Sequence, residues 1–182
     1  MLNNWVVIPT CLPLVRRRCH ACTSEHFRAN GKFRVNANHK LLDAWLLVLC
    51  TGCGDTAKLT VFERTNVRSV RPELLDRLHA NDLGLAAELL QDPVVQRRNR
   101  VALDWRDAWR LDTGGSDHLD REVLDVSVRF TARIPLRPVR LIAEGCGLPR
   151  AEVERLITEG KLVSAVRLGG KLSGDFTFTL KR

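Results

Sequence analysis

The clearest pattern in the chain is a strict alternation of apolar and polar residues over positions 124–131. Its apolar members are Leu124, Val126, Val128 and Phe130, and its polar members are Asp125, Ser127, Arg129 and Thr131. Successive side chains of a strand point to opposite faces, so a period of two predicts a strand with one buried face. Shorter strand-like stretches at residues 32–35, 45–49 and 59–62 predict that the first part of the chain is rich in β-structure.

The middle of the chain begins with helix signals. Pro72 fits the first turn of one helix, and Asn81 and Asp82 are candidate caps for a second helix that Pro93 ends. Apolar residues at helical spacing support both helices: Leu74, Leu75, Leu78, Leu85, Leu89 and Leu90. We therefore expect a helical pair after the β-rich part.

Residues 103–111 read differently. Their odd positions are mostly apolar and their even positions mostly charged, which favours one strand, although Trp105 and Trp109 could instead share a helix face. The following residues, 113–120, contain Gly114 and Gly115 and are a loop by composition.

The C-terminal part predicts two helices and a final strand pair. Pro138 opens the first helix, and Gly145 and Gly147 stop it. The second helix begins near Pro149 and ends at Gly160. The expected buried residues are Val139, Ile142 and Cys146 in the first helix, Val153, Leu156 and Ile157 in the second, and Phe176, Phe178 and Leu180 in the last strand.

These elements predict an α+β protein of three parts. Residues 1–70 form an N-terminal zinc-ribbon β module, residues 71–132 a mixed helix and strand region, and residues 133–182 a small C-terminal α/β domain. The chain has 182 residues, of which 45% are hydrophobic, so it can bury a core. Its longest purely apolar run is far too short to cross a membrane, and no secretory signal precedes it, so we expect a cytoplasmic protein without membrane contact.

Charge is distributed unevenly along the three parts. The net charge is +6 over residues 1–70, −3 over residues 71–132 and +5 over residues 133–182, for a total of +8. Basic ends around an acidic middle suggest a polyanionic partner, because a nucleic acid backbone attracts Lys and Arg regardless of its sequence. Simple solubility is the alternative explanation.

The candidate chemistry lies in two Cys-x-x-Cys pairs, Cys19 with Cys22 and Cys50 with Cys53. Each pair can form a tight turn that presents two thiolates, and four thiolates complete a closed tetrahedral zinc site. Such an ion folds a small β module rather than catalysing a reaction. An exchange-active disulfide, an iron–sulfur cluster and two unrelated structural pairs are the alternatives.

Two histidines near the first pair are possible substitutes for a cysteine ligand. His20 lies between the two cysteines and His26 follows them. Since four cysteines already form two pairs, we expect both histidines to be surface groups. Cys11 and Cys146 stand alone and carry no predicted role.

The stretch between the cysteine pairs carries a family resemblance. Its carriers are the two pairs together with Phe33-Arg34-Val35-Asn36-Ala37-Asn38 and Leu42-Asp43-Ala44-Trp45-Leu46. With these residues the chain resembles, over its whole length, an uncharacterised bacterial family, the domain of unknown function numbered one thousand and sixty-two. That resemblance implies no activity.

The C-terminal part resembles the small RNA-binding domain named for ribosomal protein S-four. The carriers are Arg140-Leu141, Leu148-Pro149-Arg150, Val153, Leu156-Ile157, Gly160-Lys161 and Gly170-Lys171, although Pro149 replaces the serine that usually caps the second helix. In that family a basic helix face and the following loop grip structured RNA. The resemblance therefore implies RNA contacts from Arg137, Arg140, Arg150, Arg155, Lys161 and Lys171.

Catalytic motifs are missing from the sequence. It has no phosphate-binding Gly-x-x-x-x-Gly-Lys loop, no His-Glu-x-x-His, no Gly-x-Ser-x-Gly and no Gly-x-Gly-x-x-Gly after a strand. The sequence also has an acidic stretch, with Asp104, Asp107, Asp112, Asp117 and Asp120. Because arginines are interspersed among these residues, we expect a solvated charged surface rather than a catalytic or magnesium site. Ser116, Asp117 and His118 are adjacent only in sequence, whereas a triad must converge in space.

The sequence thus predicts a zinc-containing RNA-binding protein that does not catalyse a reaction, with ribosomal or transfer RNA as the structured partner. A DNA-binding regulator is the first alternative, because the two C-terminal helices around Gly147 also read as a helix-turn-helix. An adaptor that binds another protein and an enzyme that uses the acidic loop are the others.

Overall fold

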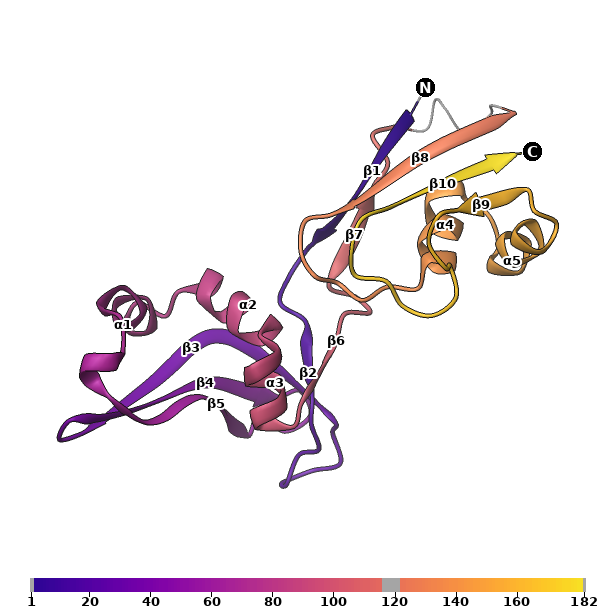
Figure 1. Cartoon of the computed structure of the whole chain (residues 1–182). Coiled ribbons are helices and arrows are strands. Elements are labelled where there is room, and N and C mark those ends of the chain that lie inside the picture. The colour runs from indigo at the N-terminus through magenta and orange to yellow at the C-terminus, as the bar shows by residue number, and fades with distance from the viewer. Residues whose placement is uncertain (1, 116–121, 182) are drawn as a thin grey trace. The chain divides into compact units, whose positions relative to one another are not determined.

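The chain folds into two compact units in a computed structural model, which describes residues 2–115 and 122–181 (Figure 1). Leu12–Asp107 form one unit, here called the inserted unit. Met1–Cys11 and Ala108–Arg182 form the other, here called the terminal unit, because it combines both ends of the chain. Sheets and helices are present in both, so the predicted α+β class is confirmed.

A five-stranded sheet is the framework of the inserted unit. Its strands are β2 (Leu14–Arg16), β3 (His26–Asn38), β4 (Leu41–Cys50), β5 (Thr56–Asn66) and β6 (Ala102–Asp104). They follow the order β5-β4-β3-β2-β6 with antiparallel neighbours. The three stretches predicted as strands from the sequence fall inside β3, β4 and β5, which confirms a β-rich first part.

Three helices cover one face of this sheet. They are α1 (Pro72–His79), α2 (Leu83–Gln91) and α3 (Pro93–Asn99), and a short 3-10 helix, η1 (Val67–Ser69), precedes them. Figure 1 shows them on one side of β3, β4 and β5. The core between sheet and helices contains, among others, Ala44, Leu46, Val48, Leu59, Leu78, Leu85 and Leu90. Pro72 and the Asp82 cap act as predicted, since Asp82 accepts the N–H of Leu85 at 2.5 Å.

A second five-stranded sheet belongs to the terminal unit. Its strands are β1 (Leu2–Pro9), β7 (Trp109–Asp112), β8 (Val123–Phe130), β9 (Leu162–Ser164) and β10 (Phe176–Lys181), in the order β7-β1-β8-β10-β9. β1 and β8 are parallel, and the other neighbours are antiparallel. The alternation that predicted β8 is confirmed, because Leu124, Val126 and Val128 are buried.

Two helices, α4 (Pro138–Cys146) and α5 (Arg150–Thr158), complete the terminal unit. Pro138 lies in the first turn of α4 as predicted, and α5 begins directly after Pro149. Gly147 has a φ of +64° and ends α4, but Gly145 lies inside the helix rather than ending it. A Cβ on Gly145 would lie 2.4 Å from the Trp5 ring, so this glycine permits close packing of helix on strand.

Three further differences from the sequence prediction concern residues 71–132, and the first is α3, a third helix after the predicted pair. The predicted single strand over residues 103–111 is two strands, β6 and β7, because Arg106 turns back onto Asp104 and ends the first. The predicted boundaries near residues 70 and 132 do not coincide with the two units, since α1, α2 and α3 pack in the inserted unit and β8 in the terminal unit. Among the described residues, no helix is long and apolar enough to cross a membrane.

Candidate metal centre

The first cysteine pair lies in the loop that joins β2 to β3. The ladder between these strands continues past their ends, because the Arg17 N–H donates to the Glu25 carbonyl at 2.9 Å and the Cys19 N–H to the Ser24 carbonyl at 2.9 Å. The chain therefore turns tightly between Cys19 and Ser24. This turn holds Cys19 and Cys22 together at the end of the sheet.

The second pair lies in the turn that joins β4 to β5. Here the Cys50 N–H donates to the Asp55 carbonyl at 2.8 Å and the Gly54 N–H to the Cys50 carbonyl at 3.0 Å. Gly54 has a φ of +76°, a conformation that glycine adopts without steric cost. A Cβ on Gly52 would lie 3.2 Å from the Cys22 sulfur, so a glycine here lets the two turns approach each other.

The four sulfur atoms converge as the sequence predicted. The Cys22 and Cys50 Sγ atoms are 3.5 Å apart, those of Cys19 and Cys53 are 3.7 Å apart, and all four lie within 4.8 Å of one another. A tetrahedral ion with metal–sulfur bonds of about 2.3 Å requires sulfur separations of about 3.8 Å. These separations fit one metal ion, and they are too long for disulfide bonds.

Backbone N–H groups point at three of the sulfurs. The Ala21 N–H donates to Cys19 at 3.4 Å, the Ser24 N–H to Cys22 at 3.5 Å and the Gly52 N–H to Cys50 at 3.4 Å. Each donor lies two residues after its cysteine, so both turns have the same local geometry. Hydrogen bonds to a sulfur favour its thiolate form, which is the form that binds a metal.

The thiols also perturb one another. The N–H of Cys53 lowers the pKa of Cys50 to about 6. The N–H of Asp55 lowers the pKa of Cys53, but contacts with the Cys22 and Cys50 thiols outweigh it and raise that pKa to about 12. Like charges at this separation cannot all form without compensation. A cation at their centre supplies that compensation, so the cluster suits a metal ion.

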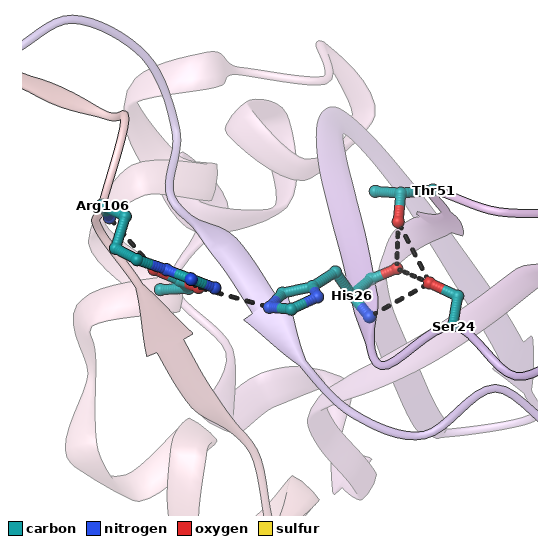
Figure 2. Close-up of polar contacts among 5 residues, drawn as sticks. Ser24, His26, Thr51 and Arg106 are labelled. Atoms are coloured by element: carbon teal, nitrogen blue, oxygen red, sulfur yellow. Dashed lines mark hydrogen bonds and ion pairs between the residues drawn. The ribbon is translucent and has the colours of Figure 1, made fainter.

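A polar network joins the two turns to the sheet. The Thr51 hydroxyl donates to the His26 carbonyl at 2.9 Å, and the Ser24 hydroxyl donates to the same carbonyl at 3.3 Å (Figure 2). The two hydroxyls lie 3.1 Å apart. Thr51 follows Cys50 and Ser24 follows Cys22 after one residue, so this network ties one turn to the other. Sequence analysis did not single out these two residues, since Ser and Thr are common in turns.

The His26 side chain is directed away from the cysteines. Its Nε2 lies 3.2 Å from Asp104, which Arg106 also holds at 2.6 Å. Arg106 above all keeps the pKa of the Asp104 carboxyl well below its usual range. Figure 2 shows the His26 ring pointing toward Arg106. His20 is exposed and stands outside the four-sulfur cluster, so neither histidine takes a cysteine's place in it.

The six basic residues proposed for RNA do not gather in one place. Arg155 pairs with Glu152 and Glu159, and Lys161 also lies 3.3 Å from Glu159. Arg140 is half-buried, with its guanidinium 5.4 Å from the centre of the Trp109 ring. The remaining three, Arg137, Arg150 and Lys171, are exposed.

Two of these exposed residues are neighbours. Leu136 and Leu172 form an antiparallel bridge with 2.8 Å hydrogen bonds in both directions, which brings Arg137 beside Lys171. Arg150 stands at the start of α5, beyond the opposite end of α4. The basic residues thus fall into separate groups rather than one helix face.

The acidic stretch shows no convergence among the described residues. Asp104 is bound by His26 and Arg106, while Asp112 accepts the Gly114 N–H at 3.1 Å and lies 4.0 Å from Arg110. Asp107 and Asp112 are exposed. Ser116, Asp117, His118 and Asp120 lie outside the described residues.

Comparisons with known proteins identify one family. No curated protein and no solved structure matches the chain. A family model described as "Protein of unknown function (DUF1062)" matches residues 35–168, which include the second cysteine pair and reach from β3 into the terminal unit. Because that match extends over well more than half of the sequence, the chain belongs to this family of unknown function.

Proposed function

We propose that the protein is a non-catalytic RNA-binding protein whose inserted unit is stabilised by one zinc ion. The observation that carries the proposal is the set of four cysteine sulfurs within 4.8 Å of one another. Four thiolates fill every position of a tetrahedral ion and leave none for a substrate or an activated water. The metal therefore acts on folding rather than on chemistry.

Zinc is the metal that this environment favours. A tetrahedral site of four sulfurs is typical of zinc or of iron–sulfur chemistry. Each sulfur comes from a short turn of a small β-sheet, as in structural zinc sites with closely spaced ligand pairs. Such a site needs reduced thiols, which the cytoplasm maintains.

Charge supports RNA as the partner. The inserted unit has sixteen Lys and Arg residues against eleven acidic residues. In the terminal unit, Arg137 and Lys171 lie side by side and have no ion pair among the described residues. Phosphate groups attract such surfaces regardless of base sequence.

The charge of α5 argues against the helix-turn-helix alternative. Two helices do meet at Gly147, but the second one carries Glu152 and Glu154 as well as Arg150 and Arg155, and Glu159 follows it. A recognition helix enters a groove lined by phosphates, where acidic side chains are repelled. RNA therefore remains the better partner than duplex DNA.

The metal is tested by elemental analysis of protein purified from metal-replete cells. We expect one zinc per chain, and we expect Cys19→Ser and Cys50→Ser each to lower the zinc content. Cys11→Ser is the matched control, because Cys11 is exposed and outside the cluster. Protein with no bound metal, or with iron in place of zinc, contradicts the proposal.

RNA binding is tested with an RNA hairpin, a DNA duplex of equal length and heparin across a salt series. We expect tighter binding to the hairpin and weaker binding at higher salt. Arg137→Ala/Lys171→Ala should weaken binding and lower the salt slope, whereas Arg155→Ala/Lys161→Ala, whose charges are paired with glutamates, should do so less. Equal, weak binding to all three polyanions contradicts an RNA function and favours the adaptor alternative.

A further inference from the structure

The sheet of the inserted unit has a second face that its helices do not cover. In β4 the side chains of Leu42, Ala44, Leu46 and Val48 are buried in the core, and the alternate residues Trp45, Leu47 and Leu49 are half-buried. Since successive side chains alternate between faces, these three point to the side opposite the helices. Three large apolar side chains thus form a row on an accessible surface.

Basic side chains flank this row on both neighbouring strands. Arg34 of β3 is opposite Trp45, and Arg28 of β3 is opposite Leu49. Lys58 of β5 is opposite Leu47 on the other side. Directly opposed residues of antiparallel strands share a face, so the six side chains form one surface. We call Arg28, Arg34, Trp45, Leu47, Leu49 and Lys58 the open sheet face.

Trp45 differs from the other tryptophans of the chain. Trp5, Trp105 and Trp109 are 2%, 5% and 8% exposed and belong to the buried interior. Trp45 is half-buried and has the Lys58 ammonium 5.0 Å from the centre of its ring. An indole that packs in no core and lies among cations is placed for contact with a partner rather than for folding.

The charges of this face are available to a partner. Arg28, Arg34 and Lys58 are exposed, and within residues 2–115 and 122–181 none of them forms an ion pair. Two carboxylates lie beside them. Asp43 of β4 already accepts the Arg64 N–H at 2.7 Å, and Glu63 of β5 accepts the hydroxyl of Thr60, the residue opposite Trp45, at 3.4 Å. The three exposed cations of the open sheet face therefore favour an anionic partner.

The face without helices in the terminal unit provides a contrast. There β8 presents Asp125, Ser127 and Arg129, and the Thr179 hydroxyl of β10 donates to Asp125 at 2.7 Å. That surface is polar and mixed in charge, as a solvated sheet face is. The two sheet faces that helices leave uncovered therefore differ in character. Among the residues that the structure describes, only the open sheet face combines large apolar side chains with unpaired cations.

We propose that the open sheet face binds an unpaired segment of RNA, a step that rests on the proposed RNA-binding function. A base would stack on Trp45, its neighbours would contact Leu47 and Leu49, and the phosphates would lie near Arg28, Arg34 and Lys58. Unpaired bases can stack on aromatic side chains, whereas bases of a duplex are hidden in their own stack. Lys58 would leave the ring for a phosphate, because such a contact is weak at an exposed site.

The metal centre supports this surface from one end. Leu49 precedes Cys50, and Arg28 follows Phe27, the residue paired with Cys50 across the sheet. Metal binding fixes the ends of β3 and β4, so it also fixes the spacing of the side chains on the open sheet face. A structural metal thereby contributes to binding without touching the RNA.

The test measures the affinity of the intact, metal-loaded protein for a single-stranded RNA and for the same RNA annealed to its complement. Wild type should prefer the single strand. Trp45→Ala should weaken that binding about 5- to 150-fold, the range found for removing one stacking side chain, and Trp45→Phe should retain most of it. Arg34→Glu should weaken it as well, and because Arg34 is exposed this variant keeps the core intact.

Arg129→Glu is the matched control, since Arg129 is exposed on the polar sheet face of the terminal unit. Equal weakening by Arg129→Glu and Arg34→Glu would overturn the assignment to the open sheet face. Wild-type affinity in Trp45→Ala and Arg34→Glu, while RNA is still bound, would overturn the inference and leave the proposed function standing. Absence of RNA binding by wild type in low salt would refute both.

Discussion

Asp104 shows how a single side chain can join strands that are far apart in sequence. Its carboxylate receives His26 of β3 at 3.2 Å and the Arg106 guanidinium at 2.6 Å, and the Arg106 N–H donates to it at 3.0 Å. The Asp104 side chain is 10% exposed, so water replaces these contacts poorly. Asp104 thereby holds the end of β6 beside the strand that follows the first cysteine pair.

We predict that Asp104→Asn lowers the free energy of unfolding of the inserted unit by about 1–3 kcal/mol at pH 7, because hydrogen bonds to a charged group are lost. Arg106 holds the pKa of Asp104 below its usual range, so the ionised carboxylate stabilises the fold above the unfolded pKa of about 3.9. That advantage disappears as pH falls toward the folded pKa. Wild type and variant should therefore converge below about pH 4.

Urea unfolding at several pH values measures this difference, with metal content followed so that both chains are compared at equal occupancy. Asp107→Asn removes the same charge from an exposed neighbour and should change the free energy of unfolding by no more than about 0.5 kcal/mol. A constant gap between wild type and Asp104→Asn from pH 7 to pH 3 would exclude the ion pair as the cause.

At the scale of residues, the sequence predicted the role of a side chain only where that residue type, in that spacing, has few possible roles. Two Cys-x-x-Cys pairs have few roles other than metal binding or redox chemistry, and the four sulfurs do converge. The role of Trp45 could not be read in the same way, because a tryptophan at an alternating position fits a core equally well. Only the strand pairing shows which face of β4 meets the helices.

At the scale of elements, Gly145 shows that helix propensity alone does not explain why a glycine lies in a helix. The glycine was expected to stop α4, yet the helix continues through it to Cys146. A Cβ there would meet the Trp5 ring at 2.4 Å and the Leu111 side chain at 2.9 Å. The glycine therefore sets how closely α4 approaches β1 and β7.

We predict that Gly145→Ala destabilises the terminal unit by about 1–3 kcal/mol through overpacking. Without that contact, alanine inside a helix would be the more stable residue by about 1 kcal/mol. Urea unfolding of wild type, Gly145→Ala, Trp5→Phe and the double variant measures the effect. The smaller ring removes the clashing atoms, so Gly145→Ala should cost less in the Trp5→Phe background, and a cost equal in both backgrounds would refute the contact.

Elements with local signals were predictable, and those defined by distant partners were not. The alternation in β8 and the prolines that begin α1 and α4 can each be recognised within a few consecutive residues. β1 pairs in parallel with β8, with Leu2 opposite Asp125. The residues around β1 give no signal that identifies so distant a partner. Residues 103–111 failed for a related reason, because β6 and β7 join different sheets although their residues form one alternating run.

At the scale of the whole molecule, the two units have separate cores. The four-cysteine cluster and its sheet lie entirely within Leu12–Asp107. The buried residues Trp5, Val126, Leu141 and Phe178 belong to the terminal unit. Metal binding supplies folding free energy only to the unit that contains the ligands.

We therefore predict that a strong chelator unfolds the inserted unit and leaves the terminal unit folded. Hydrogen exchange followed by mass spectrometry should show lost protection in β3, β4 and β5 and unchanged protection in β8 and α4. Cys50→Ser should reproduce this pattern without chelator, and Cys11→Ser should not. Simultaneous loss of protection in both units would mean that they fold as one cooperative body.

The insertion also predicts which part of the chain can be removed. In the terminal unit, the Thr10 N–H donates to the Ala108 carbonyl at 3.0 Å, and Pro9 pairs with Trp109. The two ends left by removing Leu12–Asp107 are thus already adjacent, so a link of two or three glycines from Cys11 to Ala108 should close the chain at a small entropic cost. The shortened chain keeps all five strands of the terminal unit's sheet, together with α4 and α5.

This shortened chain should fold and unfold cooperatively, as measured by near-ultraviolet circular dichroism of Trp5 and Trp109 and by urea titration. Residues 133–182 alone, the C-terminal part expected from sequence, should stay unfolded because they lack β1, β7 and β8. Without those strands, the buried faces of α4 and β10 are open to water, and a segment so short has little other core to stabilise it. If residues 133–182 folded alone and the shortened chain did not, the boundary drawn from sequence would describe the domain better than the contacts do.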